Sequence, residues 1–345
     1  MGTDTGVLVA GGKYRVLQQV QASPSSRRIE IGTPNCCRYC GQTDPKMFRT
    51  AAHTFPEALG NKRIFSRDEC DACNQLFSAY EDALATAISP FLTVGGTRGK
   101  GGTVRATGRS RGGAQARHRR SSDGKRQLSF IAQGVDLDEY APVTPDGRHF
   151  ELKIPLPPTP FRPRHAYKAL VKMGLALVPE ELLPHYTRLT RWLQDPVDQV
   201  DFNVLEVGLS FGSIGNAPPI VSGALLQRVN DEDEIPYLYF LFCAGSVCAQ
   251  ISLKSDDLED HLPPSHMGDI RIEWASVLGG HPTKPPIRIE YRHERIFNWA
   301  ELQTQPQPVE HFVLNFDALT TAGSLKPVFR DDEAAPGTSR SGSAI

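Results

Sequence analysis

The chain has 345 residues, which is too long for one small core and suggests roughly two domains of about 150 residues each. Apolar residues make up 39% and charged residues 22%, as in ordinary soluble proteins, and no run approaches the ~18 consecutive apolar residues of a membrane span. The formal net charge of −1 favours no class of partner. Because no basic stretch precedes the short apolar run near the N-terminus, we expect no secretory signal and a cytoplasmic location.

Residues 1–33 are weakly patterned and are predicted to form an N-terminal arm, with strands at 14–20 and 28–31. Cysteines follow in two short clusters, and in a cytosolic chain such clustering favours metal binding over disulfides. The clustered residues are Cys36, Cys37, Cys40, Cys70 and Cys73. Two further cysteines, Cys243 and Cys248, lie in an apolar strand-like run and are predicted to be buried core thiols.

Cys37 and Cys40 form one C-x-x-C pair, and Cys70 and Cys73 form another. Two such turns complete a closed tetrahedral Cys₄ shell, which is typical of structural Zn²⁺. The gap between the pairs, residues 41–69, is 29 residues long, against roughly 15–20 in a simple zinc ribbon, so a substantial insert separates the knuckles. Cys36 is the spare thiol, because pairing it with Cys40 gives a poorer C-x-x-x-C knuckle. The alternative is two reduced, unrelated thiol pairs.

A helix is predicted directly after the second knuckle, because apolar residues recur at spacings of three and four between Leu76 and Ile88, before Pro90. Residues 95–126 are rich in Gly, Ser and Arg and are predicted to be a mobile basic linker, with ten basic residues against one acid between 97 and 126. Flexible arginines neutralise phosphates, so nucleic-acid binding is predicted here, and a solvated linker is the alternative. The candidate nucleic-acid-binding residues are Arg98, Lys100, Arg105, Arg109 and Arg111.

Residues 127–330 are predicted to form a larger α+β domain, in which an antiparallel sheet packs against a helix pair. The helices are expected at 165–178 and 180–194, on either side of Pro179, and an acidic hairpin turn at 231–234. Strands are expected at 128–137, 148–157, 203–212, 219–229, 236–253, 269–279 and 286–297. From its position, this domain is interpreted as a specificity or sensing domain, and residues 331–345 as a disordered tail.

The pieces CRYCG, AHTFPEALGN and ECDACN occur in an order that resembles the HNH nucleases, the ββα-metal endonuclease family, over about residues 34–94. The resemblance implies a small zinc-stapled nuclease domain that hydrolyses DNA and leaves 5′-phosphate ends. It implies that His53 is the general base, since a neutral imidazole takes a proton from water near neutral pH. It also implies that Asn74 ligates Mg²⁺ or Mn²⁺ through its amide oxygen. Asn61 is the nearest candidate for the Asn that pins the hairpin loop.

The sequence departs from the family at Ala52, where members usually carry an acidic or His metal ligand. Glu57 and Glu81 are then the candidates to complete the catalytic-metal ligands, with phosphate or water; the alternative is that both are surface carboxylates. Asn74 alternatively caps its helix, and a loop histidine such as His53 is, outside this context, usually just solvated.

Three functions follow from these residues. The leading one is a metal-dependent DNA endonuclease, with a role in bacterial defence against foreign DNA by analogy. The alternatives are a non-catalytic zinc-stabilised nucleic-acid-binding protein and a structural zinc protein whose second domain binds a protein partner. RNA is a second nucleic-acid partner that the basic stretch fits. A single-site nuclease must reposition to cut both strands, which favours a homodimer.

Overall fold

The structure, a computed structural model, describes residues 8–99, 101–104, 106–107, 115–120, 126–131, 149–155, 159–205, 207–211, 219–245, 247–259, 288–290, 298–306 and 311–317. Within these ranges, every helix is too short or too polar to cross a membrane. The disordered tail predicted at 331–345 and the strand predicted at 269–279 lie outside the described residues.

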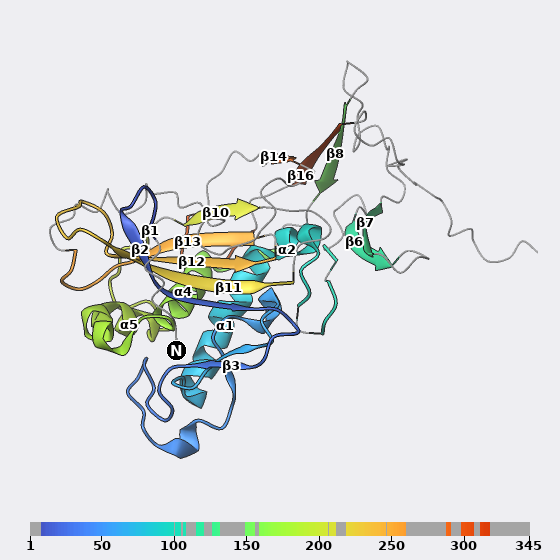
Figure 1. Ribbon diagram of the computed structural model, residues 1–345. Helices are drawn as coiled ribbons and strands as arrows, with labels where there is room; N and C mark the ends of the chain where they lie inside the picture. Colours follow the sequence, from blue (N-terminus) through green and yellow to red (C-terminus); the bar gives the residue numbers. More distant parts are fainter. Residues whose placement is uncertain are drawn as a thin grey trace, which may run out of the picture.

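A six-stranded antiparallel sheet, in the order β1-β2-β11-β12-β13-β10, dominates the fold (Figure 1). The strand expected near residue 14 is β2, and it pairs with β11 from the other half of the chain. The apolar run expected as one strand divides at Gly245, which adopts a left-handed φ of 61° between β12 and β13. The strands are β1 (Leu8–Val9), β2 (Tyr14–Ala22), β10 (Gly208–Phe211), β11 (Val221–Arg228), β12 (Leu238–Ala244) and β13 (Val247–Leu253).

Helices cover one face of this sheet (Figure 1). The predicted helix after the second knuckle is α1, and Pro90 lies at the start of a second helix, where its missing N–H costs nothing. The first predicted helix is present as Pro163–Leu175, and the chain breaks at Pro179 as expected. The second, expected at 180–194, divides into a 3₁₀ segment, Glu180–Tyr186, and a short α-helix, Thr187–Leu193. The predicted combination of an antiparallel sheet with helices is thus confirmed. The helices are α1 (Asp71–Ala87), α2 (Ser89–Gly95), α4 (Pro163–Leu175), α5 (Thr187–Leu193) and the 3₁₀ turns η1 (Pro45–Met47), η2 (Glu57–Leu59) and η3 (Glu180–Tyr186).

One continuous hydrophobic core joins the cysteine-bearing segment to the large sheet. Helices α1 and α4 pack directly against each other, and α4 packs on β13. Phe55, from the segment between the knuckles, is fully buried and lies against Phe242 of β12, with ring centroids 5.3 Å apart. The zinc-knuckle segment therefore shares its core with the second half of the chain, while the domain boundaries drawn above remain a prediction.

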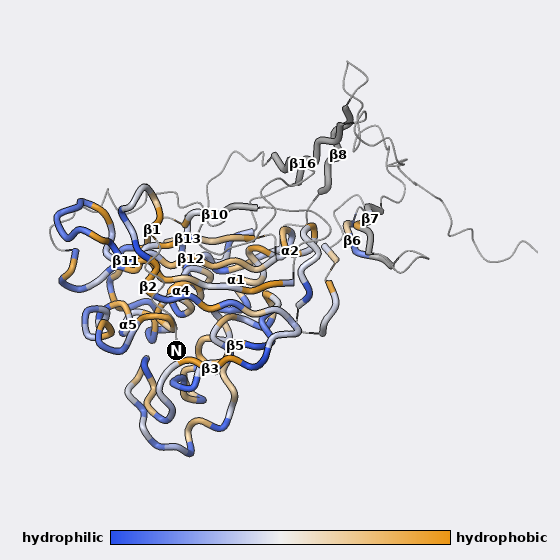
Figure 2. The backbone as a smooth tube through the Cα atoms, viewed as in Figure 1, coloured by the Kyte–Doolittle hydropathy of each residue, from blue (hydrophilic) through white to orange (hydrophobic). Residues whose placement is uncertain are grey.

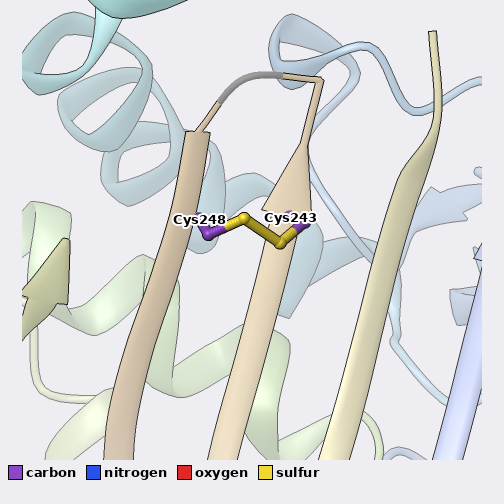
Figure 3. Close-up of a disulfide and its surroundings, with 2 residues drawn as sticks. All are labelled: Cys243 and Cys248. Carbon is purple, nitrogen blue, oxygen red and sulfur yellow. A yellow bond between two sulfur atoms is a disulfide. The ribbon is translucent and has the colours of Figure 1, made fainter. Parts of the chain in front are cut away.

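The opposite face of the sheet carries a second apolar cluster. Central strands β11 and β12 are buried along their whole length, and the apolar colour of the central strands is visible in Figure 2. Cys243 and Cys248 lie on this face as a cross-strand pair between β12 and β13. They form a disulfide, so the prediction of two free thiols is wrong, although both residues are buried as expected (Figure 3). The pairing register, which the sequence does not reveal, places the two cysteines directly opposite each other.

Part of the basic stretch is structured and not a mobile linker. β6 (Gln115–Arg120) pairs with β7 (Arg126–Ile131) in an antiparallel hairpin. Ala116 is fully buried, and His118 Nε2 lies 2.6 Å from the carbonyl oxygen of Thr93 on α2. In the sequence, the many arginines of this stretch mask the alternation that turns Ala116 and His118 inward. The remaining strands are β3 (Ile29–Ile31), β4 (Ala52–His53), β5 (Ile64–Ser66), β8 (His149–Pro155), β9 (Pro160–Phe161), β14 (Arg288–Glu290), β15 (Gln305–Pro306) and β16 (His311–Asp317).

The close approach of Phe55 to β11 yields a test of the shared core. A Cβ atom at Gly223 would lie 2.5 Å from Phe55 Cζ and 3.2 Å from Leu177 Cδ1. We expect Gly223→Ala to lower the free energy of unfolding by about 1–3 kcal/mol, because the Phe55 ring must move. Chemical denaturation measures this. Gly208→Ala is the control, since its Cβ would meet only ordinary contacts at 3.5 Å or more. Equal stability of both variants would contradict the tight packing of Phe55.

Candidate metal centre and active site

Four cysteine side chains converge where the turn at residues 37–41 meets the start of α1. The Sγ atoms all lie within 4.8 Å of one another, with Cys37 3.8 Å from Cys73 and Cys40 3.6 Å from Cys70. Zinc–sulfur bonds of about 2.3 Å in a tetrahedron place sulfur atoms roughly 3.8 Å apart. The four thiols therefore fit one Zn²⁺ ion, and they are the set predicted from the C-x-x-C spacing. Cys36 stays outside the cluster and is exposed.

A tight turn holds the first pair of thiols, and the start of helix α1 holds the second pair. Gly41 adopts a left-handed φ of 71°, and its N–H donates to the carbonyl oxygen of Cys37 at 2.8 Å, which closes the first knuckle. Cys70 is the N-cap of α1 and Cys73 lies in its first turn. The hydrogen bond between the Cys37 and Cys73 sulfur atoms, with help from backbone N–H groups, lowers the pKa of the Cys37 thiol below its ordinary value. The thiolate is the form that binds metal.

The first knuckle is tied to helix α4 by the buried Arg38. Its guanidinium pairs with Asp68 at 2.5 Å and donates to the carbonyl oxygens of Leu175 and Val178, at 2.6 and 3.0 Å. A cation at a helix C-terminus satisfies carbonyls that lack a helical partner. Gly32 has a φ of 84°, and a side chain there would overlap the Asp68 carboxylate. The metal centre and α4 are therefore held in one arrangement.

A β-hairpin lies between the knuckles. β4 pairs antiparallel with β5, and β3 adds a parallel strand on the other side of β5. The buried Asn61 closes the hairpin loop: its Nδ2 donates to the carbonyl oxygens of Phe55 and Ile64, both at 2.8 Å. Its Oδ1 accepts from the N–H groups of Arg63 and Ile64 at 3.1 and 2.9 Å. The amide thus uses its full hydrogen-bonding capacity to hold the loop.

His53 lies on β4 with its ring half-buried. The ring packs on Phe65 of β5, with centroids 4.5 Å apart, and its Nδ1 is buried without a hydrogen-bond partner among the described residues. Burial lowers the pKa of His53 below 6.5, although the carboxylates of Glu57 and Glu81 oppose the shift. The imidazole is consequently neutral at neutral pH, the form that accepts a proton. Ala52 precedes His53 on β4, so its side chain points to the opposite, inner face of the hairpin, where it is buried.

The remaining candidate ligands do not form a complete cation site around His53. Glu81 Oε1 accepts a hydrogen bond from Lys172 Nζ at 2.9 Å, and Glu57 lies 4.0 Å from Lys62. Asn74 is half-buried in the first turn of α1. Among the described residues, the cysteine cluster is the only group of His, Cys, Asp and Glu ligand atoms close enough to hold an ion.

Two knuckles therefore enclose a histidine-bearing hairpin and lead into a helix. A model of the HNH endonuclease family matches residues 37–87. The predicted resemblance is confirmed there. We call this stretch the HNH segment. Neither the curated proteins nor the solved structures compared with the chain gave a match.

The HNH segment contains most of the predicted site residues: the four clustered cysteines, both asparagines, the two glutamates and His53. The nucleic-acid candidates lie beyond it. Arg98 is exposed, and its backbone passes beside Gly60 in the hairpin loop. The other four, Lys100, Arg105, Arg109 and Arg111, lie outside the described residues.

Sequence reasoning missed a basic face beside His53. Glu30, Phe65 and His53 are register partners across β3, β5 and β4, so their side chains share the outer face of this small sheet. Arg28 lies over the Phe65 ring, with its guanidinium carbon 4.0 Å from the ring centroid. Arg28 and Arg67 lie 2.8 and 3.6 Å from Glu30, and their side chains are 51% and 48% exposed. The alternation of arginines with apolar residues in RRIEI and KRIFSR was the available signal.

We predict that the purified protein holds one Zn²⁺ per chain and that Cys73→Ser loses it, because three thiolates leave the closed shell incomplete. Elemental analysis measures the metal, and a thermal melt should show a lower melting temperature for the same variant, because metal binding contributes to folding. Cys36→Ser is the control, since that thiol is exposed and outside the cluster. Zinc retained in Cys73→Ser, or lost in Cys36→Ser, would refute the ligand set.

Proposed function

We propose that this chain is a metal-dependent HNH-type endonuclease that hydrolyses phosphodiester bonds in DNA, with His53 as the general base. The observation that carries the proposal is the family match over a segment with a Cys₄ site, a histidine on a hairpin strand and an asparagine at the start of the next helix. The match by itself supports a nuclease or metal-binding function, and the reaction is our inference.

The surroundings of His53 support its role as a base. Contact with Phe65 fixes the plane of the ring, and pairing of β4 with β5 fixes its backbone. The lowered pKa keeps the imidazole unprotonated at neutral pH. A positioned base of this kind takes a proton from the attacking water in the transition state and typically contributes about 10²–10⁴-fold to the rate.

We propose Mg²⁺ or Mn²⁺ as the second metal. Asn74 is the protein ligand best placed by the family pattern, and Glu57 is the second candidate. Glu81 is a poorer candidate because its carboxylate is engaged by Lys172. Magnesium commonly binds through one or two protein groups plus substrate phosphate and keeps several waters, so an incomplete protein site fits this ion. When bound, the ion neutralises charge on the scissile phosphate.

The basic face supports a phosphate-bearing substrate. Arg28 and Arg67 are exposed beside His53, and their two charges exceed the single charge of Glu30. Such arginines neutralise backbone phosphates without reading sequence. DNA as opposed to RNA, a homodimer, a cytoplasmic location, a defence role and a sensing role for the second half of the chain remain predictions.

A non-catalytic nucleic-acid-binding protein is the second candidate. The observation that favours it is the inner face of β4, where the buried Ala52 stands in the position that usually supplies another metal ligand. In that case the zinc centre and the basic face would hold nucleic acid without cutting it. Gel-shift binding that persists without any metal-dependent nicking would favour this function.

We expect the purified protein to nick supercoiled plasmid with Mg²⁺ or Mn²⁺ and EDTA to stop the reaction. His53→Ala should lower the rate by about 10²–10⁴-fold, because the general base is lost. His185→Ala is the control, since this histidine of η3 pairs with Asp257 and lies outside the HNH segment. Undiminished nicking by folded, zinc-loaded His53→Ala would refute the assigned base.

The pH profile gives a separate prediction. Only the neutral imidazole accepts a proton, and burial lowers the pKa of His53 from 6.5. We therefore expect the acid limb of log kcat/KM to bend below pH 6.5 and the rate to be nearly maximal at neutral pH. An inflection at pH 7 or above would contradict the burial argument.

A further inference from the structure

A buried lysine from outside the HNH segment reaches the strand that carries His53. Lys172 belongs to α4, and its side chain is 0% exposed. Its Nζ donates to the backbone carbonyl oxygen of His53 at 2.7 Å and to Glu81 Oε1 on α1 at 2.9 Å. The same nitrogen lies 3.1 Å from Oε2 of Glu69, which directly precedes the second knuckle. An ammonium has three N–H donors, and three partners surround this one.

These contacts keep the lysine charged despite its burial. Burial by itself would lower the pKa of Lys172, but the carboxylates of Glu69 and Glu81 outweigh it and hold the pKa above its ordinary value. Charge-assisted hydrogen bonds are short and strongly directional. The ammonium therefore joins three elements at one atom: β4 through the His53 carbonyl, α1 through Glu81, and the residue before the second knuckle, Glu69.

We propose that Lys172 is a positioning residue for His53, and this inference rests on the nuclease function proposed above. By binding the His53 carbonyl and the α1 carboxylate together, the ammonium sets the hairpin histidine against the helix that carries Asn74. General-base catalysis depends on such placement, since small displacements from the productive geometry lower rates steeply. Lys172 also withholds Glu81 from cation binding, because the carboxylate already has a charged partner.

A second lysine of the same helix provides a matched control. Lys168 lies one turn before Lys172, is equally buried, and pairs with Asp198 at 2.8 Å. Its cationic nitrogen lies 4.7 Å from the ring centroid of Trp192 and 5.4 Å from that of Tyr80 on α1. Within the described part of the chain, its hydrogen bond and ion pair go to Asp195 and Asp198, and not to β4 or the knuckles. Neutralising each lysine together with its most buried carboxylate removes a buried ion pair, and at Lys172 it leaves only Glu81, whose side chain is 20% exposed to water. The two changes differ in whether the carbonyl of His53 loses its donor.

The experiment compares Lys172→Met/Glu69→Gln with Lys168→Met/Asp198→Asn in the full-length zinc-loaded protein. We expect the first variant to lose at least tenfold in kcat for plasmid nicking with KM changed less than twofold, and the second to keep kcat within twofold. The ¹³C–¹H ring signal of His53, assigned by its absence in His53→Ala, should shift in the first variant only. Parallel losses of activity in both variants, with an unshifted ring signal, would overturn the proposal.

The ring signal separates this inference from the nuclease proposal. If the parent protein does not cut DNA, a shifted His53 signal in the Lys172 variant still supports the proposal that Lys172 positions His53. An unshifted signal overturns it. If the Lys172 double variant fails to fold, the single variant Glu81→Gln is measured in its place. That carboxylate is 20% exposed, and its neutralisation removes one partner of the ammonium. An unchanged His53 signal in folded Glu81→Gln would then count against the proposal.

Discussion

Helix α1 must bury one long apolar face, and this requirement determines which elements of the chain pack around it. The metal centre covers only the first turn of this helix, through Cys70 and Cys73. The next turns bury Phe77, Tyr80 and Leu84, and the short β4–β5 hairpin is too small to cover them. Helix α4 packs directly on α1 and itself packs on β13 of the large sheet, within the same hydrophobic core. The hydrophobic core of the HNH segment is thus completed by the rest of the chain.

The local parts of the site could be read from the sequence because each depends on short spacings. The C-x-x-C pairs identify the metal ligands, since two residues between cysteines place both thiols on one turn. The apolar spacing after Cys73 identifies α1, and a breaker such as Pro179 separates the two later helices. The HNH pattern predicts the roles of His53 and Asn74, which remain predictions, and points to Asn61, whose amide bonds across the hairpin loop.

Long-range contacts could not be read in this way. The pairing of β2 with β11 and the opposition of Cys243 to Cys248 depend on register, and no local signal sets a register between distant strands. Lys172 resembles any surface lysine in an amphipathic helix, and only the packing of α4 on α1 buries it. The basic face was overlooked because the denser arginine run at 97–126 dominated the charge pattern.

The parallel pairing of β3 with β5 has a consequence for the modularity of this motif. β5 has a neighbour on each side, but β3 ends before the HNH segment begins. A fragment cut at the family boundary would leave one edge of β5 with unpaired backbone N–H and C=O groups. Such edges recruit strands from other molecules and promote aggregation. The unit that can be transplanted to another protein is thus longer than the unit that a family pattern recognises, and it starts at or before Ile29.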